Sequence, residues 1–233
     1  MADEPIISPG PSTNGKSFLI DTTKCFACRS CQVACKQWNG LAAEDPVPTN
    51  RGTYENPSDL SHTQWLLIHF KETERGDGTL AWNFVRNSCR HCIDAPCRQA
   101  ATNKDAITID EETGAVLFHA ATRDEDFARI RDACPFHIPR RDPATGQMFK
   151  CRMCVDRVHN GLLPACATAC PSGAILFGDR QEMLDLAQAR LEAIGDQFPD
   201  AAVLDRRDVR LLILLGDRES MNKLTTLETA ETE

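Results

Sequence analysis

The chain has 233 residues, enough for one large domain or two small ones. Its formal net charge of −8 argues against nucleic acid as a partner, because nucleic-acid binding needs a basic face. Aromatic residues make up only 6% of the chain, so a purely apolar core would be modest. The twelve cysteines are the obvious candidates for organising the fold.

Neither secretion nor membrane insertion is expected from the chain itself. The N-terminal residues Met1–Pro5 are acidic and lack the basic and apolar stretches of a signal peptide. The apolar run Leu211–Leu215 is far shorter than the ~20 residues that a bilayer requires. We therefore expect no secretory signal and no transmembrane helix.

In chain order, residues 1–15 are rich in Pro and Gly and predict an extended arm, and residues 41–63 predict a surface insertion. A short helix is expected at 29–38. The predicted strands are short and alternate with cysteine groups: 17–20, 65–70, 82–85, 107–109, 116–118 and 174–177.

The C-terminal part has a different pattern. Met183, Ala187, Leu191 and Ile194 follow helical spacing, and the segment 209–215 is strand-like. The polar tail 225–233 is expected to be disordered when alone.

The cysteine spacing is the most specific feature of the sequence. The first group reads C-x2-C-x2-C-x3-C, the bacterial ferredoxin pattern in which the fourth cysteine ligates the other of two clusters. Cys170–Pro171 closes the last group in the same manner. The twelve positions are Cys25, Cys28, Cys31, Cys35, Cys89, Cys92, Cys97, Cys134, Cys151, Cys154, Cys166 and Cys170.

Crossing the fourth ligands predicts three [4Fe–4S] clusters with no thiol left over. The first site would use Cys25, Cys28, Cys31 and Cys170. The second site would use Cys151, Cys154, Cys166 and Cys35, with residues 159–162 looping out between the second and third of these. The third site would use Cys89, Cys92 and Cys97, completed by Cys134, the only thiol that remains.

The spacing resembles a four-cluster design that has lost one whole cluster. The ferredoxin pattern would place further cysteines where the chain has Ala101, Asp124, Phe127 and Ile130.

Zinc binding and disulfide bonds are the two other possible uses of the cysteines. Zinc is bound by C-x2-C pairs, but four cysteines within eleven residues do not form two zinc knuckles. Disulfides are typical of small secreted domains, and no secretory signal is expected here. The sequence also lacks a nucleophile–base pair, a phosphate-binding glycine loop and paired carboxylates. We therefore expect no catalytic residue here, and electron transfer rather than substrate chemistry.

Four segments carry a resemblance to a known family. They are Cys25–Trp38 (CFACRSCQVACKQW), Cys89–Cys92 (CRHC), Ala133–Arg140 (ACPFHIPR) and Cys151–Arg157 (CRMCVDR). These resemble the iron–sulfur β subunits of soluble molybdenum or tungsten formate dehydrogenases, within the molybdopterin oxidoreductase family. The likeness extends over residues 17–216.

The resemblance implies an α+β fold with two ferredoxin-like cluster-binding modules and a C-terminal helix–strand extension. The expected divisions are an arm at 1–16, a first module of two clusters at 17–85 and 141–180, an inserted one-cluster module at 86–140, and the extension at 181–233.

The resemblance also implies a catalytic α subunit that holds a Mo or W bis-pterin cofactor and oxidises formate to CO2. This chain would receive the electrons and pass them to a soluble acceptor such as a cationic cytochrome c. Periplasmic location by co-export with the catalytic subunit is expected, with the cytoplasm as the alternative. Other candidates are the β subunit of a polysulfide, thiosulfate or sulfoxide reductase, and a free-standing polyferredoxin.

Charged residues suggest two further roles. Cations near an anionic cluster raise its reduction potential, and seven basic residues lie beside cysteines in the sequence: Arg29, Lys36, Arg90, His91, Arg98, Lys150 and Arg152. An acidic set near the third site is a candidate for steering a cationic carrier: Asp110, Glu111, Glu112, Asp124, Glu125, Asp126 and Asp132. An ordinary solvated face is the alternative for both sets.

Overall fold

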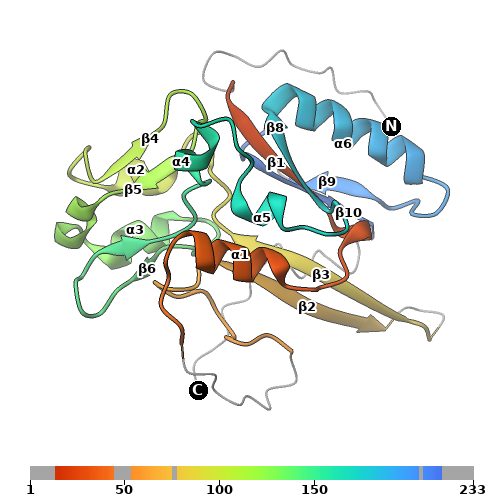
Figure 1. The fold of residues 1–233 in the computed structure, drawn as a ribbon, viewed down its shortest axis with the longest axis horizontal. Helices are drawn as coiled ribbons and strands as arrows, with labels where there is room; N and C mark the ends of the chain where they lie inside the picture. Colours follow the sequence, from red (N-terminus) through yellow and green to blue (C-terminus); the bar gives the residue numbers. More distant parts are fainter. Residues whose placement is uncertain (1–13, 45–53, 75–77, 205–206, 217–233) are drawn as a thin grey trace.

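Short helices and short strands alternate along the chain in the computed structural model, which describes residues 14–44, 54–74, 78–204 and 207–216. The predicted α+β class is confirmed (Figure 1). The helices are α1 (Ser30–Trp38), α2 (Pro96–Ala100), α3 (Phe127–Ala133), α4 (Val155–Val158), α5 (Ala165–Thr168) and α6 (Arg180–Ile194). Within these described ranges no helix is long and apolar enough to cross a membrane.

Among the described residues, the strands form one four-stranded sheet and three two-stranded ribbons. The sheet has the order β8-β1-β10-β9, in which β1 pairs parallel to β10 and antiparallel to β8. The ribbons are β2–β3, β4–β5 and β6–β7. The strand bounds are β1 (Lys16–Asp21), β2 (Leu66–Glu74), β3 (Leu80–Ser88), β4 (Ile107–Ile109), β5 (Val116–Phe118), β6 (Arg140–Arg141), β7 (Met148–Phe149), β8 (Ile175–Asp179), β9 (Ala202–Leu204) and β10 (Leu211–Leu215).

The two faces of the four-stranded sheet have different coverings because side chains alternate along a strand. Leu19, Leu212 and Leu214 pack with Met183 and Ala187 of α6. The residues between them point to the opposite face, where Phe18, Ile20, Leu211 and Ile213 pack in a core that also contains cysteines. Helix α6 therefore covers one face of the sheet, and the cysteine-bearing segments cover the other (Figure 1).

All five residues of β10 are buried, as expected for a strand covered on both faces. This strand belongs to the segment predicted as a C-terminal extension, yet it lies between β1 and β9 inside the sheet. The apolar stripe predicted within 183–194 is confirmed as part of α6. The C-terminal segment thus contributes a central strand of the sheet.

A separate apolar core lies under α2, α3 and the β4–β5 ribbon. Its buried members include Ala106, Ile107, Val116, Ile130 and Met148. The hairpin predicted at 107–109 and 116–118 is confirmed, with Ile107 paired to Phe118. This core supports the segments that carry Cys97 and Cys134.

The described residues of the segment 41–63, predicted as a surface insertion, are mostly exposed or half-buried, but two of them are buried. Leu60 is buried, and the buried Glu55 carboxylate accepts a hydrogen bond of 2.6 Å from the Phe70 amide. Most of the predicted arm and the polar tail 225–233 lie outside the described residues.

Candidate metal centres

Strand pairing brings Cys170 beside the first cysteine group. In the antiparallel pair, Ile20 at the end of β1 lies opposite Ile175 at the start of β8. The Asp21 amide also donates to the Ala174 carbonyl, at 2.8 Å, so the pairing continues past the strand ends. The chain after β1 and the chain before β8 therefore run side by side, and they carry Cys25 and Cys170.

The first site is a cavity at the surface edge of the protein. This partly open cavity has about 450 Å³ of empty space and is lined by Cys25, Cys28, Cys31 and Cys170. Cys28 is exposed and Cys25 and Cys170 are half-buried, whereas Cys31 is buried. The four thiols predicted for the first site thus share one partly open cavity.

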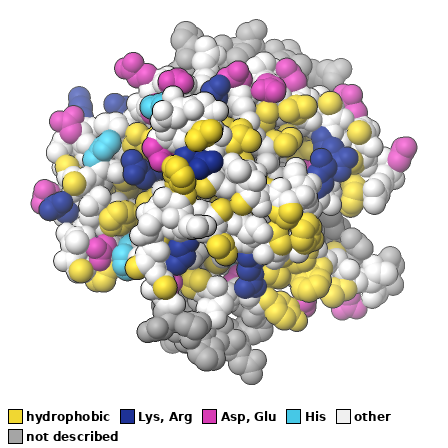
Figure 2. Space-filling model, viewed as in Figure 1, with side chains coloured by type: hydrophobic (Ala, Val, Ile, Leu, Met, Phe, Trp, Pro, Cys, Tyr) yellow, Lys and Arg dark blue, Asp and Glu magenta, His cyan; other side chains and the backbone are white. Residues whose placement is uncertain are grey.

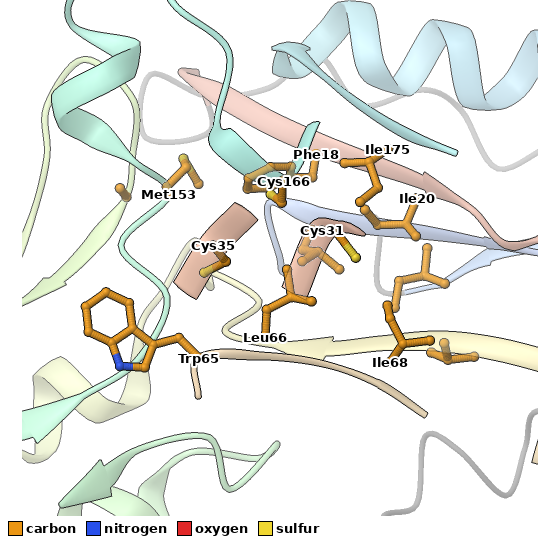
Figure 3. Packing of buried hydrophobic residues seen from close by; sticks show 14 of the residues in the cluster. Phe18, Ile20, Cys31, Cys35, Trp65, Leu66, Ile68, Met153, Cys166 and Ile175 are labelled. Carbon is orange, nitrogen blue, oxygen red and sulfur yellow. The ribbon is translucent and has the colours of Figure 1, made fainter. Parts of the chain in front are cut away.

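The second site lies deeper, where α1 packs against α5. All four of its predicted thiols are buried: Cys35, Cys151, Cys154 and Cys166. Burial raises the pKa of Cys35 well above its ordinary value, and the nearby thiols of Cys151, Cys166 and Cys154 raise it further. Cys31 and Cys35 are four residues apart on α1, one turn from each other along the same face. Figure 3 shows both with Cys166 among buried apolar side chains.

The third site is a cavity of about 330 Å³ lined by Cys89, Cys92, Cys97 and Cys134. Cys89 and Cys92 follow β3, Cys97 lies on α2, and Cys134 directly follows α3. Burial raises the pKa of Cys92 to about 12, with further contributions from its three neighbouring thiols. The thiols of the first and third groups thus each line one cavity, and Cys35 lies near Cys151, Cys154 and Cys166. The assignment of these thiols as cluster ligands stays a prediction.

The first C-x2-C turn of each of the three cysteine groups shares one backbone feature. The residue before the second cysteine has a positive φ in all three: 56° at Ala27, 50° at His91 and 59° at Met153. Non-glycine residues adopt this region at a cost on the order of 1 kcal/mol. The turn aims amides at sulfur, since the His91 and Met153 amides each donate to the preceding cysteine Sγ at 3.4 Å. Three strained turns with N–H···S bonds fit thiolates that bind a metal group.

Buried thiols also need to lose their protons in order to bind iron. Burial raises the pKa of Cys31, Cys97 and Cys154 to about 12, so these groups are protonated at neutral pH when no metal is bound. Metal binding would therefore release protons. In the described part of the chain, no three His, Cys, Asp or Glu side chains converge as they would around one ion. Four thiols spread around a cavity fit a core of several atoms better than a single zinc.

His91 presents an unpartnered donor beside these sites. It is fully buried, and its Nδ1 accepts a hydrogen bond of 3.1 Å from the Val116 amide, which leaves the proton on Nε2. Nε2 has no acceptor within the described residues. Burial, and then the cations Lys150, Arg86 and Arg210, hold the pKa of His91 well below its usual value. A neutral buried N–H without an acceptor fits a site whose anionic group would accept it.

The basic residues that are neighbours of cysteines in the sequence differ in their exposure to solvent. Arg98 and Arg152 are exposed, whereas Lys150 is buried. Arg86 was missed by sequence reasoning, although its Nη1 lies 3.4 Å from Cys166 Sγ. The two residues are 80 positions apart, so only the fold brings them together. The available signal was a charged residue directly after the predicted strand 82–85.

Apolar side chains fill the region where a fourth set of ligands was expected. Ile130 is fully buried, and Phe127 and Ala101 pack against the same core. Asp124 is exposed at the end of the short 3-10 helix Ala120–Asp124. Three of the four positions thus meet in one apolar cluster.

The expectation that all seven acidic residues near the third site could steer a carrier is wrong in part. The Glu125 carboxylate is buried and accepts hydrogen bonds from the Thr102 and Asn103 amides at 2.8 and 2.6 Å. Asp126 caps α3 by accepting from the Arg129 amide, and Asp110 contacts His159 at 2.9 Å. These three acids have structural partners. The exposed members without such a role here are Glu111, Asp124 and Asp132.

Comparison with known proteins decides the family. The chain is 47% identical over 203 residues to the formate dehydrogenase subunit beta of Megalodesulfovibrio gigas, covering 85% of this chain and 93% of the relative. The chain belongs to the iron–sulfur subunits of formate dehydrogenases. Residues 80–180 also match the 4Fe-4S dicluster domain family, a range that includes nearly all of the second and third groups.

Other members of this formate dehydrogenase family differ in how much of their length is shared. The chain is 42% identical to formate dehydrogenase 2 subunit beta (cytochrome c-553) of Nitratidesulfovibrio vulgaris, covering 88% of this chain and 94% of the relative. It is 40% identical to the formate dehydrogenase-O iron–sulfur subunit of Escherichia coli, covering 80% of this chain but 60% of that protein.

Proposed function

We propose that the chain is the electron-transfer subunit of a formate dehydrogenase and holds three [4Fe–4S] clusters in the three cysteine groups. The observation that carries this proposal is the gathering of twelve thiols into three sets of four. When bound, each cluster supplies a site for one electron. The residues of this chain bind the clusters, exclude water from the middle site and set the electrostatic surroundings.

The spatial arrangement of the three sites supports electron transfer from one site to the next. Cys31 of the first site and Cys166 of the second are close enough for their charges to interact. Cys89 of the third site and Cys151 of the second interact in the same way and share an apolar cluster. The second site is therefore adjacent to both of the others, and electrons would pass through it.

The first site is the proposed contact with a Mo- or W-pterin catalytic subunit. Exposed aromatic and apolar side chains gather on the adjacent β2–β3 ribbon and its neighbours (Figure 2). Tyr54, Phe70 and Trp82 form one ring cluster, and the Arg29 guanidinium lies 4.7 Å from the Phe70 ring centre while lining the first cavity. A protein docked there would cover both apolar surface and the open edge of the site.

The third site is the proposed exit toward a soluble acceptor such as a cytochrome c. The name of the Nitratidesulfovibrio relative includes cytochrome c-553, which favours this acceptor class. Glu111, Asp124 and Asp132 remain available for steering a cationic carrier. A cytochrome acceptor fits the periplasm, with co-export on the catalytic subunit.

We also propose the division into modules that the resemblance implies, although Met148 packs in the core of the inserted module. The crossed first and second sites belong to the module at 17–85 and 141–180, and the third site belongs to the module at 86–140. A related reductase subunit is the second candidate function, since the cysteine groups are also typical of the wider molybdopterin oxidoreductase family.

The test is anaerobic purification of the chain with whatever copurifies. We expect about twelve iron atoms per chain, four per cluster, together with a large pterin-containing subunit and formate-dependent reduction of the clusters. Replacing Trp82 by Lys should release the large subunit and leave the iron content unchanged. An iron content near eight or sixteen, or a partner that does not oxidise formate, would contradict the proposal.

A further inference from the structure

Arg86 is a fully buried cation whose contacts are mostly to sulfur and to a ring. It lies on β3 with 1% of its surface exposed. Its Nη1 and Nη2 lie 3.4 and 4.0 Å from the sulfur atoms of Cys166 and Cys151. Its Nε donates to Ser88 Oγ at 2.9 Å, and its Cζ lies 4.6 Å from the centre of the Phe18 ring.

No carboxylate balances this charge. Within the ranges that the structure describes, Arg86 forms no ion pair with Asp or Glu. A buried charge without a counter-ion is strongly unfavourable, so buried cations normally have an anionic partner. Burial lowers the pKa of Arg86, but the surrounding cysteine sulfurs outweigh it and raise that pKa. The anionic partner of Arg86 is therefore at the cysteine sites.

Arg86 lies between two of these sites. It contacts Cys166 and Cys151 of the second site, and it also lines the cavity of the first site with Cys31. One guanidinium thus faces both members of the crossed pair.

Lys150 lies at the third site and also contacts the backbone of the second. It is buried, it lines the third cavity, and its Nζ donates to the carbonyl of Cys151 at 3.1 Å. It also donates to the Val116 carbonyl and lies 4.8 Å from the Phe118 ring centre. In the described part of the molecule it too lacks a salt bridge to a carboxylate.

A cation in such a position has a definite electrostatic effect. A cluster held by four thiolates becomes more negative when it gains an electron, and a nearby positive charge makes that gain more favourable. Because neither cation is exposed, neither water nor salt screens it strongly. A cation near two sites also offsets the repulsion between electrons on adjacent sites.

We propose that Arg86 and Lys150 are buried charges that raise the reduction potentials of the sites beside them. Arg86 would act on the first and second sites, and Lys150 on the second and third. This inference rests on the proposed three-cluster function. It gives the second site, which both cations face, the largest combined effect. That site is the one whose four thiols are all buried, where burial alone would make reduction least favourable.

The test is a redox titration followed by EPR on the purified heterodimer, with Arg86→Gln and Lys150→Gln. Each midpoint potential is assigned to its site by its absence in a cysteine variant of that site. Arg86→Gln should lower the midpoints of the first and second sites and leave the third unchanged. Lys150→Gln should lower those of the second and third sites and leave the first unchanged.

The matched controls separate charge from structure. Arg86→Lys keeps a cation and should restore most of the potential. Arg152→Gln and Arg98→Gln remove exposed cations that lie beside cysteines in the sequence, and they should cause smaller shifts that vanish at high salt. The shifts caused by Arg86→Gln and Lys150→Gln should persist at high salt.

Iron content, measured on the same samples, distinguishes failure of the three-cluster function from failure of the proposed role of the two cations. Wild-type protein without about twelve irons would contradict the proposed function itself. Unchanged midpoints in fully loaded Arg86→Gln and Lys150→Gln protein would overturn only the role of the cations. Loss of iron from both Gln variants would also overturn it, because the cations would then be needed for assembly rather than for the potential.

Discussion

The first and second sites have related cysteine patterns but opposite surroundings. The first site has one exposed thiol, Cys28, and two half-buried ones. The second site has four buried thiols, supplied by α1, by α5 and by the segment Cys151–Cys154. In the proposed crossed ligation the two sites exchange their fourth cysteines, so they would be built from the same segments and still differ in their access to water.

The difference arises from packing around the cysteines. The first site lies beyond the ends of β1 and β8, at the edge of the sheet, where few elements can cover it. The second site lies between α1 and α5, and the Gln32 side chain, accepting from the Ile68 amide at 3.0 Å, ties α1 to the β2–β3 ribbon. Spacing thus indicates which thiols act together, and tertiary packing decides which site can meet a partner.

The largest effect is expected from removing a thiol of the buried site. Cys166→Ala should lower the melting temperature by on the order of 10 °C, because this site joins segments that are far apart in the sequence. Cys28→Ala, at the exposed edge, should lower it less. Both should reduce the iron content. Thermal unfolding with iron analysis checks this, and equal losses of stability would break the comparison.

An intermediate effect is expected in the apolar region where a fourth set of ligands is missing. Ile130→Ala should lower the free energy of unfolding by about 2–5 kcal/mol, because removing this buried side chain leaves a cavity in the apolar core. The iron content should stay unchanged, in contrast to the cysteine variants. If this substitution released iron, the apolar core and the third site would not be independent.

A smaller effect is expected at Glu125. Hydrogen bonds from Thr102 and Asn103 outweigh the opposing effect of burial and hold the pKa of this carboxyl below its ordinary value. Glu125→Gln should therefore lower stability by about 1–3 kcal/mol at pH 7.

The pH dependence follows from the direction of that shift. A lowered folded-state pKa stabilises the protein above the unfolded value of about 4.3, and this stabilisation is lost as the pH falls through the folded pKa. The difference in melting temperature between wild type and Glu125→Gln should accordingly shrink below about pH 4. A difference that is constant from pH 7 to pH 3 would show that the carboxylate charge is not what matters.

The sequence was sufficient for features that depend on local pattern. The strand at 17–20, the helix within 29–38 and the hairpin around Gly114 are all confirmed, because alternation and turn residues determine them. The cysteine spacing also indicated which thiols line the first and third cavities.

Other features depend on contacts between distant segments and left no local signal. Arg86 faces sulfur atoms 65 and 80 residues away, so nothing beside it in the sequence indicates its neighbours. Sequence analysis grouped Glu125 with the surface acids because the sequence gives its charge but not its tertiary contacts. The amides of Thr102 and Asn103, which donate to its carboxylate, are 23 and 22 residues away. The place of β10 inside the sheet is likewise a matter of tertiary pairing.

The most direct test of the account is the pair of variants Cys170→Ala and Cys35→Ala, examined by cluster-resolved EPR. The account predicts that Cys170→Ala removes or alters the signal of the site that holds Cys25, Cys28 and Cys31, and leaves the second and third signals. Cys35→Ala should do the same to the site that holds Cys151, Cys154 and Cys166. The opposite assignment, in which each variant damages the cluster of its own sequence group, would contradict the crossed arrangement.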